Sequence, residues 1–170
     1  MSALQLQVEE WVSTINTNQW LVEKQLEGLS HEDTMLELPF RGNRLNWVVG
    51  HLAEHRDWML RAMDCTTLMP AKEAMMYRRG SEPLMDDSDA VAIETLLGYL
   101  RQTKTCLENQ LQSVSDDFLM EIPTTGILLE SHRDKTRLQR IKGLQWHETY
   151  HMGQLELLRQ LAGTDDAILK

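Results

Sequence analysis

The sequence has few residues that interrupt helices or build disulfide frameworks. Only four prolines and nine glycines occur in 170 residues, and 42% hydrophobic with 25% charged residues is the usage of a globular chain. The two cysteines, Cys65 and Cys106, form no CxxC pair, and residues 1–10 do not resemble a secretory signal. We therefore expect one domain over residues 1–170 of a cytoplasmic protein, with both cysteines reduced and buried.

Long hydrophobic runs and basic clusters are also missing. Apolar runs such as Trp47-Val48-Val49 are far shorter than the ~20 residues that cross a bilayer. The net charge of −9 repels phosphate backbones, and the longest run of Lys or Arg is the pair Arg78-Arg79. We therefore expect no membrane span and no nucleic-acid partner.

Apolar residues recur at helical spacing in four parts of the chain. This periodicity predicts helices over about residues 3–28, 44–64, 89–113 and 133–162. Ser30 is expected to cap a short turn, Asn43 or a neighbour to cap the second long helix, and Ser88 or Asp89 the third. Gly163 is expected to end the fourth.

Two connections between these helices are longer than about 12 residues. The first is the Met-rich stretch over residues 66–87, and the second surrounds Pro123. With no convincing strand pattern and no repeat, the sequence predicts an all-α protein, a four-helix bundle with long connections. Such connections are expected to be crossovers or covers over a site.

Four of the six histidines form two HxxxH pairs, His51 with His55 and His147 with His151. Side chains four residues apart lie about 40° apart around a helix and ~6 Å apart along it, so both rings can reach one ion. His147 and His151 fall in the apolar stripe of their helix, where a metal satisfies both rings at once. The spacing also fits core histidines bonded to carbonyls, and helical angles slightly favour His55 over His51 as the third ligand.

The segments NWVVGHLAEH and HETYHMGQL together resemble the signature of the DinB/YfiT-like metalloprotein superfamily. In that family the histidine of a GHLA segment joins two histidines of a late HxxxHxGQ segment. The resemblance implies that His51, His147 and His151 bind the metal. It also implies a four-helix bundle of unusual helix order, with the ion near one end, and frequently a homodimer.

Three histidines with an open coordination position form a catalytic rather than a structural zinc site, and nickel or iron accepts the same nitrogens. At such a position a water is acidified or a substrate thiol binds as thiolate. Because some family members use bacillithiol or mycothiol, the resemblance implies an S-transferase or hydrolase acting on a small molecule. The alternative is a non-catalytic dimeric module in a stress response or in ligand binding, favoured by the lack of a sure acid or base.

Other polar residues near the ligands are assigned supporting roles. Helical angles direct Glu54 outward and place Glu148 beside the core stripe, so neither is assigned as the base. His55 is left out of the three-histidine ligand set, and it either supports the ligands, adds a fourth one or lies at the surface. Gln154 resembles a family glutamine that orients a ligand or a loop.

The remaining residues near the motifs are expected to be structural. Gly50 and Gly153 are expected to permit close helix packing, and His31 and His132 to face solvent. Four aromatic residues near the motifs could wall a pocket, but helix aromatics of a bundle are mostly core residues, and all four are assigned to the core: Trp47, Trp58, Trp146 and Tyr150.

Overall fold

The computed structural model describes residues 3–39, 41–86, 88–124, 130–164 and 168, and every regular element among them is a helix. The all-α prediction is therefore confirmed. The four long helices are α1 (Ala3–Leu26), α3 (Leu45–Ala62), α5 (Ile93–Ser113) and α7 (Arg137–Gln160). The short ones are α2 (His31–Thr34), α4 (Ala71–Tyr77), α6 (Asp116–Met120) and the 3₁₀ helix η1 (Glu130–His132). Within the described ranges, none of these helices combines the length and apolar character needed to cross a membrane.

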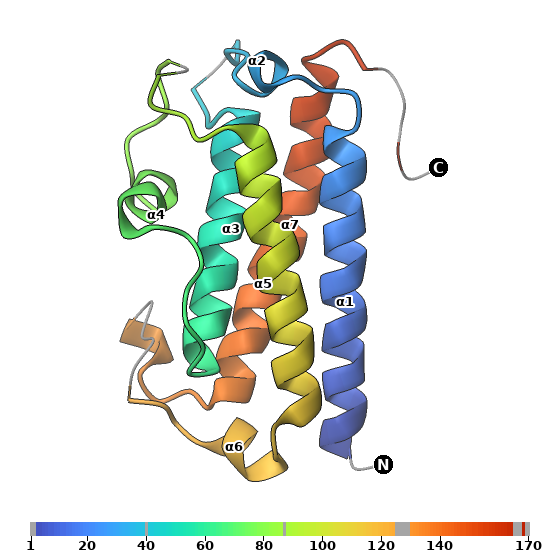
Figure 1. Ribbon diagram of the computed structural model, residues 1–170, viewed down its shortest axis with the longest axis vertical. Helices are drawn as coiled ribbons and strands as arrows, with labels where there is room; N and C mark the ends of the chain where they lie inside the picture. Colours follow the sequence, from blue (N-terminus) through green and yellow to red (C-terminus); the bar gives the residue numbers. More distant parts are fainter. Residues whose placement is uncertain (1–2, 40, 87, 125–129, 165–167, 169–170) are drawn as a thin grey trace.

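The four long helices lie side by side along the longest axis of the molecule (Figure 1). α1 and α7 run in one direction, α3 and α5 in the other. α1 packs against α5 and α7, and α3 packs against the same two helices. Because α3 and α5 are parallel, the chain between them must return along the outside of α3, and α4 lies on this returning segment.

The first long connection is thus the expected crossover. The second is not, because α5 ends and α7 begins at the same end of the molecule (Figure 1). Residues 125–129 of that connection, and residue 87 of the first, lie outside the described residues.

The helix ends follow local capping chemistry only in part. Ser30 starts α2 with a capping box, as expected, and Thr136 starts α7 with another. The caps expected for α3 and α5 are wrong, because these helices begin after Arg44 and Ala92, which form no side-chain cap. Gly163 lies just beyond α7 with a φ of +76°, a conformation that glycine adopts readily.

Two groups of buried hydrophobic side chains fill the interior. One lies toward the start of α3 and the end of α7 and includes Leu52 and Leu155. The other lies toward the end of α3 and the start of α7 and includes Met59 and Leu144. Most of the buried polar residues of α3 and α7, among them His51, Arg56 and Glu148, lie between the two groups, near the middle of both helices.

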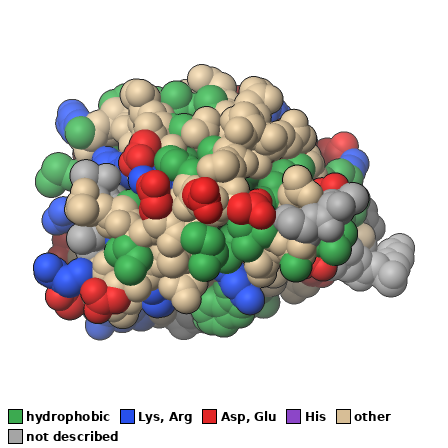
Figure 2. Space-filling view, turned by 90° about the horizontal axis from the view of Figure 1, so that it is seen from below, with side chains coloured by type: hydrophobic (Ala, Val, Ile, Leu, Met, Phe, Trp, Pro, Cys, Tyr) green, Lys and Arg blue, Asp and Glu red, His purple; other side chains and the backbone are tan. Residues whose placement is uncertain are grey.

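The acidic character of the chain is visible at one end of the molecule. Figure 2 shows the end that holds the start of α1 and α6, where acidic side chains form a row beside hydrophobic ones. No histidine of the described residues is visible on this face. The histidine motifs are therefore not presented at this end.

Candidate metal centre

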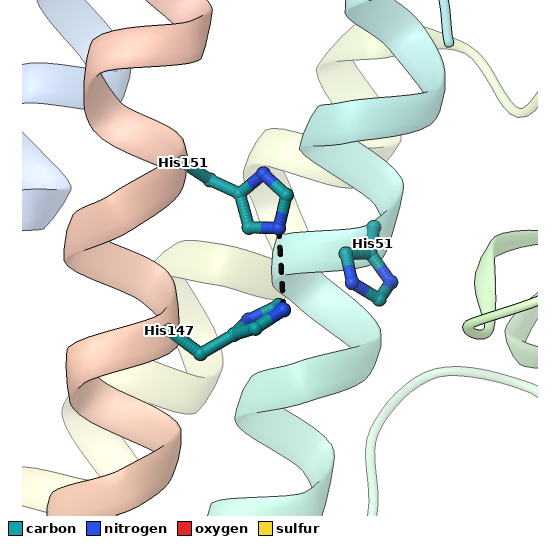
Figure 3. A group of neighbouring side chains, drawn as sticks. All are labelled: His51, His147 and His151. Carbon is teal, nitrogen blue, oxygen red and sulfur yellow. Dashed lines mark hydrogen bonds between the residues drawn. The ribbon is translucent and has the colours of Figure 1, made fainter. Parts of the chain in front are cut away.

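Helices α3 and α7 bring His51, His147 and His151 together. One ring nitrogen from each lies within 4.8 Å of one ring nitrogen of the other two. Figure 3 shows the rings of His147 and His151 extending from α7 toward α3, where His51 lies. The two α7 rings approach through their Nε2 atoms, which are 3.3 Å apart. Tetrahedral zinc with Zn–N bonds of about 2.0–2.1 Å separates its nitrogen ligands by about 3.3–3.4 Å, so this spacing fits one ion.

Hydrogen bonds on the far side of two rings determine which nitrogen is free. His51 Nδ1 lies 2.7 Å from the carbonyl oxygen of Tyr77, and His151 Nδ1 lies 2.7 Å from Gln154 Oε1. Because both oxygens only accept, each Nδ1 donates, and each neutral ring keeps its lone pair on Nε2. Gln154 therefore makes the kind of orienting contact expected of it.

Burial keeps these rings neutral. Desolvation lowers the pKa of both His51 and His147 to about 4, with smaller contributions from neighbouring histidines and from the charge of Arg79. Desolvation also lowers the pKa of His151. Neutral imidazole is the form that binds a metal. His147 is the ring held least firmly, because its buried Nδ1 has no hydrogen-bond partner in the described part of the chain.

His55 belongs to the same cluster. Its ring stacks on that of His147, with centroids 3.8 Å apart and planes 10° apart. The ring centroids of His55 and His51 are 4.6 Å apart, and these two rings meet edge to face. His51, Glu54 and His55 also form a second possible ligand set. Two overlapping groups of candidate ligands thus share His51, one completed from α7 and one entirely on α3.

A family model described as the DinB superfamily matches residues 4–155, which include both histidine motifs. The chain belongs to the DinB superfamily. The resemblance drawn from the two motifs is therefore confirmed. No curated protein matches the chain. The DinB superfamily is metal-associated, and this member carries a histidine cluster that fits a metal ion.

A cavity of about 380 Å³ opens beside the cluster of this DinB-superfamily protein. Its lining residues come from α3, α7 and the segment after α4: Glu54, His55, Trp58, Arg78, Arg79, Gly80 and His147. A volume of this size is typical of sites for small molecules. The cavity thus gives a small molecule access to two rings of the histidine cluster.

Glu54 does not point to solvent, and the expectation that it does is wrong. Its exposed fraction is 7%, and it lines the cavity, because the segment that carries α4 packs on this side of α3. The indole N–H of Trp58 donates to Glu54 Oε1 at 2.5 Å. Burial raises the pKa of Glu54 to about 7, so this carboxyl exchanges its proton near neutral pH.

Glu148 has a structural partner that the sequence did not reveal. Its carboxylate is fully buried, and Oε1 accepts hydrogen bonds from Nε and Nη2 of Arg56 at 3.1 and 2.5 Å. Arg56 also donates to Gln19 Oε1 and to the carbonyl of Leu100, so one guanidinium joins α1, α3, α5 and α7. Residues 147–151 have the HExxH spacing in which the glutamate of a zinc protease acts as base, but this carboxylate is bound to Arg56 and does not line the cavity.

Several expectations for neighbouring aromatic and histidine residues are wrong. Trp146 and Tyr150 are 70% and 66% exposed, because they lie on the outer face of α7. Trp58 is half-buried at the cavity, whereas Trp47 is in the core as expected. His132 is buried rather than solvent-facing. It lies at the end of η1, where Nε of the buried Arg140 donates to its carbonyl oxygen.

The expectations for the glycines and cysteines are also only partly correct. A Cβ on Gly50 would lie 2.2 Å from the Tyr77 ring, which confirms a close approach there. Gly153 is exposed with no neighbour within 4 Å of such a Cβ, so its expected packing role is wrong. Cys106 on α5 is exposed, and Cys65, which follows the end of α3, is only half-buried, against the expectation of two buried thiols.

Proposed function

We propose that this DinB-superfamily protein is a metal-dependent enzyme in which His51, His147 and His151 hold one zinc, nickel or iron ion. The proposal rests on one observation: the three ring nitrogens converge within 4.8 Å of one another while Tyr77 and Gln154 hold the opposite nitrogen of two rings. Rings that are oriented in this way, neutral and next to a cavity suit a site that binds a metal and admits a substrate.

A divalent ion at this position supplies Lewis acidity, which lowers the pKa of a thiol or a water at an open coordination position. The protein's own groups do the rest. The cavity admits the small molecule, Trp58 offers an aromatic wall, and Glu54 holds or releases a proton near neutral pH. These groups support S-transfer by a low-molecular-weight thiol of the bacillithiol or mycothiol type, or hydrolysis with water in place of the thiol.

In the S-transfer reaction, the thiol sulfur forms a bond to an electrophilic carbon of the second substrate. The leaving group departs with the bonding electron pair. The thiol proton passes to Glu54, which lines the cavity where the thiol would lie. We further propose that the chain forms one cytoplasmic four-helix bundle domain over residues 1–170.

The test is a count of metal ions per chain in protein purified without a metal-affinity tag. We expect about one ion in the wild type, and its loss in the His147→Ala and His151→Ala variants without unfolding. The His55→Ala variant is expected to keep its metal, as is His31→Ala, a control on α2. If His55→Ala loses the metal while His147→Ala keeps it, the ion is bound by the set on α3 and our ligand assignment is wrong.

A second candidate, a dimeric module without catalysis, is favoured by the outer face of α7. Trp146, Tyr150 and Leu157 are 70%, 66% and 58% exposed and fall on one side of the helix. Gly143 and Gly153 on this side have no neighbour within 4 Å of an added Cβ. A two-fold axis near Tyr150 would set Trp146 of one copy against Gly153 of the other, and Leu157 against Gly143, so large residues would meet small ones.

Pairing of two copies and metal binding are separable by experiment. We expect the wild type to sediment as a dimer and the Trp146→Glu variant as a monomer that still binds metal. A wild-type dimer that stays metal-free after reconstitution with zinc, nickel and iron would favour the module without catalysis. A wild-type monomer would refute the proposed pairing.

A further inference from the structure

The longest basic run of this acidic chain lies at the cavity. Arg78 and Arg79 both line it, and both side chains are exposed. No carboxylate of the described residues lies within ion-pair distance of either guanidinium. Four other arginines form ion pairs with carboxylates: Arg56, Arg101, Arg133 and Arg137. Two cations without an internal partner are thus available to a molecule that enters the cavity.

The backbone before these arginines is firmly anchored. The Tyr77 ring is fully buried against Gly50. Its hydroxyl donates to Asn46 Oδ1 at 2.9 Å and accepts from the backbone N–H of Val91 at 2.9 Å, while its carbonyl accepts from His51. Tyr77 therefore both orients the His51 ring and anchors the backbone at the start of the arginine pair. The fold thus sets the distance between the histidine cluster and the two arginines.

The two cations act on the cavity in a way that favours anions. Arg79 lines the same cavity as His55 and His147, so its charge acts next to the cluster. Glu54 is the carboxyl that lines the cavity, and its Oε1 accepts from an indole rather than from a guanidinium. A concave site with positive walls attracts negative ligands, and a guanidinium matches a carboxylate or phosphate with paired hydrogen bonds.

We propose that Arg78 and Arg79 bind the carboxylate or phosphate of a small anionic molecule, and so hold its other end against His55 and His147. The inference deepens the proposed function and rests on it, because it names the class of substrate that the site takes. The chain as a whole, with its net charge of −9, repels such molecules. Selection of an anion therefore depends on this one pair.

Calorimetric titration with succinate and with inorganic phosphate tests the proposal, with uncharged succinamide as the matched neutral probe. We expect at least one of the two anions to bind the wild type, and succinamide to bind at least tenfold more weakly than succinate. The double variant Arg78→Gln with Arg79→Gln is expected to weaken the anion at least tenfold. The double lysine variant keeps the charge and is expected to restore part of the binding. Arg133→Gln, which removes a charge from an exposed ion pair that does not line the cavity, is expected to bind as the wild type does.

The proposal is overturned if neither anion binds the wild type, if succinamide binds as well as succinate, or if the double glutamine variant binds as tightly as Arg133→Gln. Metal content per chain, measured in every sample, separates this result from the fate of the metal site. Binding that depends on the arginines in a protein without metal would support the anion site and refute the proposed metal function. If all samples contain metal and anion binding does not depend on the arginines, the result would support the proposed metal function and refute the anion site.

Discussion

The substitution Gly50→Ala tests how the returning segment supports the histidine cluster. An added Cβ would lie 2.2 Å from Cδ1 and 2.4 Å from Cε1 of Tyr77, so the ring must move by at least about 1.2 Å to reach ordinary contact at 3.4–4 Å. Tyr77 has little freedom to move, since it is fully buried and its hydroxyl bonds Asn46 and Val91. We therefore expect its carbonyl to shift away from His51 Nδ1, which it now contacts at 2.7 Å.

Two quantities should change. Overpacking costs about 1–3 kcal/mol of unfolding free energy, against which alanine regains up to about 1 kcal/mol of helix propensity. Loss of the contact that orients a metal-binding histidine lowers metal affinity about 10–100-fold. Urea unfolding measures the first quantity, and competition with a chromogenic chelator measures the second.

The matched control is Gly153→Ala on α7. Its added Cβ meets no atom within 4 Å, so we expect unchanged metal affinity and stability that is equal or higher by up to about 1 kcal/mol. If Gly50→Ala behaves like Gly153→Ala in both assays, then the Tyr77 carbonyl does not control the orientation of His51 or keep its Nε2 free for a metal.

Three further predictions concern the surroundings of the site. Arg56→Met or Glu148→Leu alone should lower the unfolding free energy by about 3–5 kcal/mol by stranding a buried charge, and the double variant should recover most of it; additive losses in urea titrations would contradict this. Glu54 has a raised folded-state pKa, so its contribution to stability is full below about pH 4.5 and is lost as pH rises through about 7. Glu54→Gln should therefore remove a decline of roughly 1–3 kcal/mol between pH 5 and pH 8, and parallel stability curves would refute it. Leu144→Ala should cost about 2–5 kcal/mol by opening a core cavity without changing the metal count per chain, whereas a lost ion would tie this core position to the site.

The sequence predicted the features of this protein that depend on local order. Helix positions follow from periodicity, and HxxxH places His147 and His151 on one side of α7 whatever lies around it. The choice between the two histidines of α3 could not be made in this way. Helical angles slightly favoured His55, the family signature indicated His51, and the structure brings both rings into the cluster. Spacing along one helix cannot rank two residues that both face a second helix.

What the sequence could not predict follows from the crowding of α3. Every residue from Leu45 to Asp57 is buried, because α5 and α7 cover part of its surface and the segment carrying α4 covers the rest. A helix that is buried on all sides has no solvent-facing side for an apolar periodicity to indicate. Helical angles therefore wrongly predicted that the Glu54 side chain points to solvent. That segment shows no clear period, yet it supplies the carbonyl of Tyr77 to His51 and the arginine pair to the cavity. The part of the chain with the weakest sequence signal thus brings both an orienting contact and a binding surface to the site that the histidine motifs mark.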